Sequence, residues 1–156
     1  VTEYVPEYAK ELVWDENYEA LANQESIFKE QAHRINRLVG KVDVIVTDSP
    51  ILFSEIYGEN NSNGFRARIW DEHNSHDNFN LFINRGSTFE QQGRIHNLEE
   101  SKEKDNEIKQ MLDENSVYYG NYYHRTVPVI IDNIVKTLHR IQAYTEQDED
   151  DEEMEL

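Results

Sequence analysis

The stretch Val42-Asp43-Val44-Ile45-Val46-Thr47-Asp48-Ser49-Pro50 decides the fold that this sequence predicts. Its first part is dominated by β-branched apolar residues, which are typical of a strand covered on both faces in a parallel sheet. Pro50 cannot continue such a strand. Asp48 and Ser49 therefore stand at its carboxyl end, where ligands bind in open α/β sheets and where an acid can hold Mg²⁺. A strand-end turn in which Asp48 caps the next segment is equally compatible with the local pattern.

The composition limits the class of protein. The 156 residues suffice for one domain with a core of useful size, and they include no cysteine that could form a disulfide or a thiolate metal site. No run approaches the roughly 20 apolar residues that cross a bilayer. No signal peptide is visible. We therefore expect no membrane partner and a cytoplasmic location.

The net charge is −17 and is distributed unevenly. Residues 146–156 carry eight acids and no base, which leaves −9 on the rest of the chain. Like charges at this density repel one another, so we expect a disordered acidic tail over residues 145–156, after a domain at 1–144. The remaining negative charge argues against a broad duplex-binding surface, because phosphate binding requires Lys and Arg. A compact pocket in which a few basic residues meet one phosphorylated ligand stays possible.

Strand and helix patterns alternate along the chain. An apolar stripe at helical spacing (Leu21, Phe28, Ile35 and Leu38) predicts a helix over about 18–39, which Gly40 ends. The predicted strands are 1–5, 42–47, 78–84 and 117–119, the last ended by Gly120. The other predicted helices are 51–57, 65–74, 98–114 and 126–144, and residues 7–14 are predicted to form a short helix or a loop. Such alternation predicts an α/β fold in which a parallel sheet is flanked by helices on both faces.

Two groups of polar residues are candidates for a binding site. Gln24, Gln31 and Arg34 recur at spacings of seven and three beside the apolar stripe, so they either line a pocket or face solvent at its rim. Arg85 and Arg94 lie in a Gly-rich polar loop before a strongly charged helix. The segment at about 85–114 is therefore either a lid that closes over a ligand or a loop and a solvated surface helix with Lys–Glu pairs.

Four stretches, taken in order, resemble one family. They are Thr2-Glu3-Tyr4 with Lys10-Glu11-Leu12; the helix with Asn23-Gln24, Gln31 and Arg34; Val42 to Pro50, which ends in Thr-Asp-Ser-Pro; and Phe82 to Arg85, followed by Gly93-Arg94 and the helix from Glu99 to Leu112. Over residues 1–144 the chain resembles the P-loop kinase and ATPase family, which includes nicotinamide riboside kinase domains and small phage nucleoside-kinase-like proteins. The resemblance implies a protein of the cytoplasm, that of the host cell if a phage encodes it.

The resemblance also implies an activity and its residues. The family members use ATP and Mg²⁺ to phosphorylate a nucleoside or another small molecule that carries a hydroxyl, or act as related NTPases. By position, Asp48 would act on Mg²⁺ or on the attacking hydroxyl, and Arg85 and Arg94 would be lid arginines over the transferred phosphate. The remaining positions, Glu3, Gln24, Gln31, Arg34 and Ser49, would line the acceptor side.

One departure from the family pattern stands out. The phosphate-binding loop G-x-x-x-x-G-K-[ST] does not occur, and Gly40-Lys41 precedes a strand instead of following one. In the family this loop lies upstream of the strand with Glu3, and its own strand lies between those at 42–47 and 78–84. Unpaired buried backbone groups cost about 1–3 kcal/mol each. We therefore expect an upstream N-terminal segment, a partner chain or a rearranged sheet to fill this place.

Other functions stay open at this stage. The missing loop and the acidic surplus are compatible with a non-enzymatic acidic binding or inhibitory protein on a degenerate P-loop fold, which mimics nucleic acid. A kinase for a nucleic-acid 5′-hydroxyl or a modified base is a third possibility. His73 and His76 could bind a metal or lie in a surface turn. Residues 118–123 hold four tyrosines, which could stack a base or pack against the core.

Overall fold

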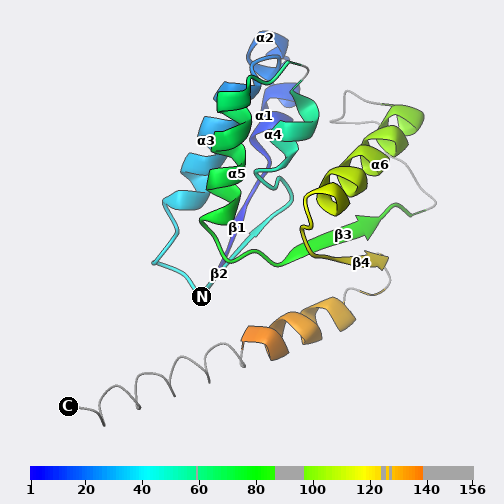
Figure 1. Ribbon diagram of the computed structural model, residues 1–156. Helices are drawn as coiled ribbons and strands as arrows, with labels where there is room; N and C mark the ends of the chain where they lie inside the picture. Colours follow the sequence, from blue (N-terminus) through cyan, green and yellow to red (C-terminus); the bar gives the residue numbers. More distant parts are fainter. Residues whose placement is uncertain (59, 87–96, 124–125, 127, 139–156) are drawn as a thin grey trace. The chain divides into compact units, whose positions relative to one another are not determined.

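The computed structural model describes residues 1–58, 60–86, 97–123, 126 and 128–138. The chain falls into two units, the first with residues 1–79 and 90–118 and the second with residues 80–89 and 119–156. Each unit contains one pair of parallel strands (Figure 1). None of the helices in these described ranges is long and apolar enough to cross a membrane.

The strands of the first unit are β1 (Thr2–Val5) and β2 (Val44–Thr47), and β1 lies parallel to β2 in a register that sets Tyr4 opposite Val46. Parallel neighbours need a long connection, which here contains three helices. These are α1 (Tyr8–Trp14), α2 (Tyr18–Leu21) and α3 (Gln24–Asn36). The strand that the Val/Ile run predicts is therefore present and has a parallel neighbour, but among the described residues it is not covered on both faces, because Val46 is 48% exposed.

The helix that was predicted over 18–39 is divided in two. Asn17 caps α2 by accepting a hydrogen bond from the backbone N–H of Ala20 at 3.2 Å, and Asn23 caps α3 in the same way from Ser26 at 3.0 Å. Asparagine side chains compete with helical backbone bonds and therefore start a new helix where they occur. The prediction that Gly40 ends this helix is wrong, because α3 ends at Asn36 with Arg37 as its C-cap, and Gly40, with a φ of 72°, lies in the turn that follows.

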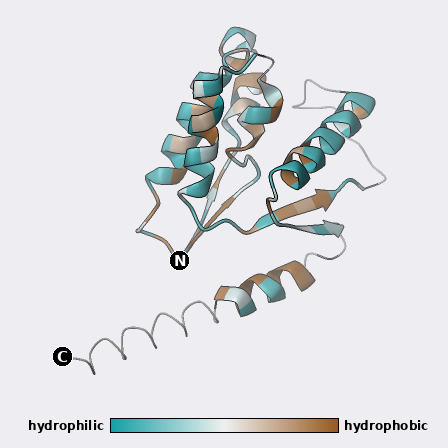
Figure 2. Ribbon diagram, viewed as in Figure 1, coloured by the Kyte–Doolittle hydropathy of each residue, from teal (hydrophilic) through white to brown (hydrophobic). Residues whose placement is uncertain are grey.

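Helix α3 is the centre of the first unit, because it contacts α1, α2, α4 (Phe53–Tyr57) and α5 (Asn63–Asn74). Its buried side chains include Phe28, whose ring meets the Phe65 ring of α5 edge to face at 5.4 Å. Ser62 caps α5 through the N–H of Phe65, so this helix begins two residues before the predicted start. The helix α6 (Leu98–Glu114) matches its predicted bounds and contacts α4. Most of its length is hydrophilic, with a buried seam of Ile108, Met111 and Leu112 (Figure 2).

The second unit contains β3 (Asn80–Asn84) and β4 (Tyr119–Tyr123), which pair in parallel, and a helix over 128–138. The prediction that Gly120 ends a strand at 117–119 is wrong. Gly120 lies inside β4 opposite Leu81, whereas Val117 still belongs to the turn after α6, because its N–H donates to the carbonyl of Leu112.

The four described strands form two separate two-stranded sheets. In this part of the chain β2 pairs with β1 and β3 pairs with β4, and no pairing joins β2 to β3. A single sheet with helices on both faces, and a further strand between β2 and β3, thus stay predictions. The predicted acidic tail at 145–156 lies outside the described residues, as does the part of the lid that comprises residues 87–96.

Candidate functional site

Asp48 lies directly after β2, as the sequence predicts, and its side chain is exposed. On the neighbouring strand, Tyr4 is paired with Val46, so the two side chains point to the same side of the sheet. Asp48 lies two residues after Val46, and alternate residues of a strand point to the same side, so Asp48 is on that side too. The hydrogen bond between the Tyr4 hydroxyl and the Asp48 carboxylate is the main cause that raises the pKa of Tyr4. The two side chains form a small polar pair at the carboxyl end of the sheet.

Ser49 and Gln31 join this strand end to the helices behind it. Ser49 is buried, and its backbone N–H donates to Oγ1 of Thr47 at 3.1 Å. The same oxygen accepts a hydrogen bond from Nε2 of Gln31 at 3.4 Å. Gln31 also donates to the carbonyl of Pro6 at 3.3 Å and accepts from the N–H of Tyr8 at 3.0 Å. The Gln31 amide thus binds atoms of the chain itself, and these contacts connect α3 to the ends of β1 and β2.

Arg34 lies one turn further along α3 and contacts two carboxylates. Its Nη1 and Nη2 bind the two oxygens of Glu11 at 2.7 and 2.8 Å, and its Nε binds Glu30 at 2.8 Å. These partners raise the pKa of Arg34, although burial opposes them, and the hydrogen bond from Arg34 lowers the pKa of Glu11. The guanidinium also lies over the ring of Tyr8, 4.8 Å from its centroid. Arg34 is therefore occupied by protein partners in this structure.

The other predicted site residues are spread over the chain. Gln24 is the first residue of α3 and is half-buried, and Glu3 is exposed on β1 opposite Ile45. Arg85 follows β3 in the second unit and is half-buried, and Arg94 lies outside the described residues. The structure thus brings Asp48 and Ser49 together at one strand end, with Gln31 linked to them through Thr47.

The residues at this strand end fit a loosely held magnesium ion. Magnesium keeps several waters and is commonly bound through one or two carboxylates and the phosphates of its substrate. A single exposed carboxylate, Asp48, suits such an ion. A cage built from protein side chains alone is not present, since the described residues contain no group of three or more acids or histidines that could hold a metal.

The two histidines of α5 and the turn after it have ordinary structural partners. His73 is buried, and its ring meets that of Trp70 edge to face at 6.0 Å. Nε2 of His76 lies 3.3 Å from Oε1 of Glu72, which also accepts a hydrogen bond from Asn36 at 2.6 Å. The surface-turn interpretation thus holds for His76 but is wrong for His73, which is a buried residue of α5 itself.

The tyrosines of residues 118–123 are divided between the two units. Tyr118 ends the first unit and is 82% exposed, whereas Tyr119, Tyr122 and Tyr123 belong to β4. The ring of Tyr119 lies 6.2 Å from that of Phe82 on the neighbouring strand. Tyr119 thus packs against a cross-strand neighbour, as the packing interpretation predicts.

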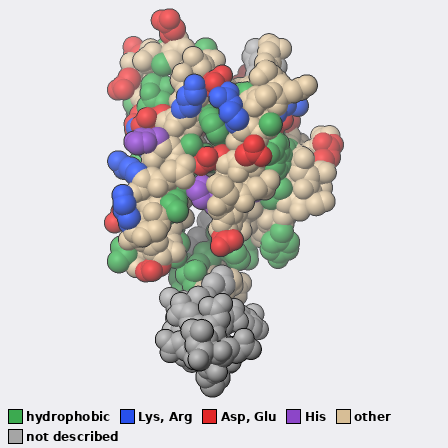
Figure 3. All heavy atoms as spheres, turned by 60° about the vertical axis from the view of Figure 1, so that its left-hand side comes forward, with side chains coloured by type: hydrophobic (Ala, Val, Ile, Leu, Met, Phe, Trp, Pro, Cys, Tyr) green, Lys and Arg blue, Asp and Glu red, His purple; other side chains and the backbone are tan. Residues whose placement is uncertain are grey.

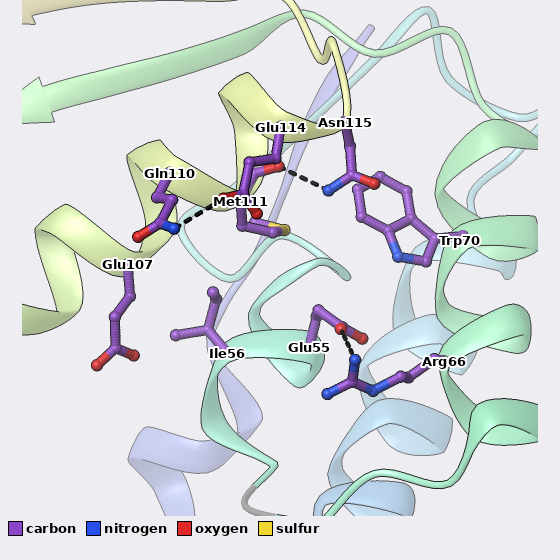
Figure 4. A pocket seen from close by; sticks show the side chains of 9 residues that line it. All are labelled: Glu55, Ile56, Arg66, Trp70, Glu107, Gln110, Met111, Glu114 and Asn115. Atoms are coloured by element: carbon purple, nitrogen blue, oxygen red, sulfur yellow. Dashed lines mark hydrogen bonds and ion pairs between the residues drawn. The ribbon is translucent and has the colours of Figure 1, made fainter.

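A cavity that the sequence did not predict lies within the first unit. It has a volume of about 470 Å³ and is formed by α4, α5, α6 and the residue that caps α6 (Figure 4). Its lining consists of Glu55, Ile56, Arg66, Trp70, Glu107, Gln110, Met111, Glu114 and Asn115. The only signal in the sequence is the run of polar residues at positions 107, 110 and 114, which share one face of the predicted helix. That spacing does not tell which other helices face it.

Comparison of the chain with protein-family models, with curated proteins and with solved structures gives no significant match.

Proposed function

We propose that this chain is part of an ATP- and Mg²⁺-dependent phosphotransferase of the P-loop class, which acts on a nucleoside or another small molecule with a hydroxyl. The observation that carries this proposal is the position of Asp48. Its carboxylate is exposed at the carboxyl end of β2 and is hydrogen-bonded to Tyr4 of the parallel neighbour β1. This end of parallel strands is where α/β proteins bind their ligands.

In phosphoryl transfer the protein mainly positions the reacting groups and stabilises the developing charge. Phosphoryl transfer proceeds when the attacking hydroxyl and the leaving oxygen are in line and the developing charge is neutralised. Bound Mg²⁺ would supply part of that neutralisation. Asp48 would hold the ion or orient the acceptor hydroxyl, with the Tyr4 hydroxyl beside its carboxylate. In the proposal, Arg85 and Arg94 close over the phosphate from the lid segment, and Glu3 and Gln24 contact the acceptor.

The contacts of two residues modify the roles that the resemblance implies for them. Gln31 and Arg34 are bound to protein partners, so we assign to them the support of the site and not direct contact with the acceptor. The 156 residues contain no G-x-x-x-x-G-K-[ST] loop, so the β- and γ-phosphates need ligands from outside this sequence. We place the reaction in the cytoplasm, where ATP and Mg²⁺ are available.

The test measures Mg-ATP binding by calorimetry and transfer of labelled γ-phosphate to a panel of nucleosides and to nucleic-acid 5′-hydroxyl ends. It uses the protein at its natural length, which intact mass spectrometry establishes. The Asp48→Ala substitution should lower the transfer rate by about 100-fold or more, as expected when a group that stabilises transition-state charge is lost. The control is Asp43→Ala, which removes an acid just before the other end of β2. Equal transfer rates in the wild type and the Asp48→Ala variant, or no Mg-ATP binding at all, would contradict the proposal.

A second candidate function follows from the charge of the chain. With 32 acids against 15 Lys and Arg, the protein could bind a basic partner as a mimic of nucleic acid. On the face drawn in Figure 3, however, basic side chains lie among the acidic ones and break up the negative surface. The salt dependence of partner binding and the affinity for Mg-ATP distinguish the two candidate functions. Mimicry requires binding to a nucleic-acid-binding protein that weakens steeply as salt rises, without any affinity for Mg-ATP.

A further inference from the structure

The cavity between α4, α5 and α6 has the size of a small-molecule site. Its volume of about 470 Å³ lies within the range of roughly 300–1,000 Å³ that is common for ligand pockets. Ile56, Trp70 and Met111 give it apolar walls, from one helix each, and carboxylates and amides complete the lining (Figure 4). Such a lining suits a ligand with an apolar body and a small number of polar groups.

Two amide donors of the lining are engaged within the protein. Nε2 of Gln110 donates to Oε1 of Glu114 at 2.7 Å, and Nδ2 of Asn115 donates to the carbonyl of Met111 at 2.8 Å. The guanidinium of Arg66 lies on the carboxylate of Glu55, with Nη1 and Oε1 3.3 Å apart. The lining holds three carboxylates against the single guanidinium of Arg66, so its charged groups are mostly acceptors.

One carboxylate oxygen of the lining residues is buried without a hydrogen-bond donor. Oε2 of Glu55 is shut off from solvent and accepts no hydrogen bond. A buried acceptor without a partner costs about 1–3 kcal/mol, and more when it is charged.

The charges of the lining favour a cation. Glu55 is paired with Arg66, and Glu107 is paired with Lys104 at 2.7 Å. Glu114 is exposed and has no cationic partner among the described residues; it accepts a hydrogen bond from the neutral amide of Gln110. The cavity thus holds an uncompensated carboxylate together with the indole of Trp70, and aromatic faces also attract cations.

We propose that this cavity binds a small organic cation, a primary ammonium group on an apolar body. The ammonium group brings three donors to a lining that offers acceptors, and its charge compensates Glu114. The apolar body lies against Trp70, Ile56 and Met111. The proposal is independent of the phosphotransferase function, because none of these residues belongs to the strand end with Asp48.

The test titrates benzylammonium into the full chain and follows Trp70. The Trp14→Phe substitution removes the other tryptophan, which is 56% exposed on α1, so that fluorescence reports Trp70 alone. In the unsubstituted protein, the two assigned indole N–H signals in the NMR spectrum give the same information. We expect a saturable change with a dissociation constant of about 1 mM, as is usual for a ligand of so few atoms. Benzyl alcohol, which has the same shape without the charge, should bind at least several-fold more weakly.

Two variants of α6 separate specific binding from general charge effects. Glu114→Gln should weaken benzylammonium binding by about three- to tenfold, because it removes the uncompensated carboxylate. Asp113→Asn makes the same change in net charge at the neighbouring exposed position, which does not line the cavity, and should alter the affinity by less than about twofold. The proposal is overturned if benzylammonium causes no saturable change, if benzyl alcohol binds equally well, or if the two variants weaken binding to the same extent.

Discussion

The guanidinium of Arg34 on α3 holds both carboxylate oxygens of Glu11 on α1, at 2.7 and 2.8 Å. Parallel paired bonds of this kind are stronger and more selective in geometry than a single contact. With Glu30 bound to Nε and the ring of Tyr8 below the guanidinium, Arg34 joins α1 to α3. The arrangement explains why a residue that the resemblance assigns to substrate binding can be important without a contact to substrate.

We predict that Arg34→Lys lowers the free energy of unfolding by about 1 kcal/mol, because lysine cannot reproduce the paired bonds to Glu11. Urea denaturation followed by circular dichroism measures the change. Arg37→Lys is the matched control, since Arg37 caps the same helix and is exposed. A variant that keeps full stability but loses affinity for the acceptor would show instead that Arg34 contacts substrate.

Gln31 is predicted to contribute more to stability than its neighbours on the polar side of α3. Gln31→Leu removes the acceptor for the N–H of Tyr8 and the donor for the carbonyl of Pro6. Since this region is buried, the loss should cost about 1–3 kcal/mol of unfolding free energy. Gln24→Leu, at the half-buried first position of α3, should change it by less than about 0.5 kcal/mol. Equal effects of the two substitutions would mean that the hydrogen bonds of Gln31 do not stabilise the fold.

Acidification should destabilise the first unit through His73. Burial, with a smaller contribution from His76, lowers the pKa of His73, so the folded protein keeps this ring neutral where the unfolded chain protonates it. The unfolded state then binds more protons, and the free energy of unfolding falls as the pH drops below the ordinary histidine pKa of about 6.5. The stability is fully present above that pH.

The prediction is checked by urea denaturation at about pH 7.5 and pH 5.5, on either side of the ordinary histidine value. His73→Phe keeps a ring against Trp70 and removes the titrating group, so its stability should vary less over this interval. His33→Phe, on the exposed side of α3, is the control. If the His73→Phe variant and the wild type lose the same free energy on acidification, other groups cause the loss.

The elements with a strong periodic pattern could be predicted from the sequence. The Val/Ile run gives β2, and the thin apolar seam in a strongly charged segment gives α6 within its observed bounds. The division of the 18–39 helix was missed because the apolar stripe continues through Asn23, although an asparagine at that place can start a helix.

The sites were harder to predict than the elements, because they depend on which elements meet. The strand end with Asp48 follows from a single segment and could be placed. Arg34 and Glu11 are 23 residues apart in the sequence, and their ion pair depends on the packing of α1 against α3. The cavity depends on three helices, and no local pattern indicates that Trp70 and Glu114 line the same space.

The role of Gly120 also depends on its neighbours in the fold and not on the local sequence pattern. Glycine commonly marks the end of a strand, but here it lies within β4 and leaves room for the ring of Tyr122. A Cβ at position 120 would lie 2.3 Å from Cε2 of Tyr122, so the ring has to move away. Gly120→Ala should therefore lower the stability of the second unit by about 1 kcal/mol.

Hydrogen exchange at the amides of β3 and β4 measures this local stability. In the Tyr122→Ala background no ring opposes the new methyl group, so Gly120→Ala should there be neutral or stabilising, because alanine loses less backbone entropy on folding than glycine does. Non-additivity of the two substitutions is the expected sign of their contact. If Gly120→Ala costs the same in both backgrounds, the glycine is required for its backbone conformation and not for the space that it gives to Tyr122.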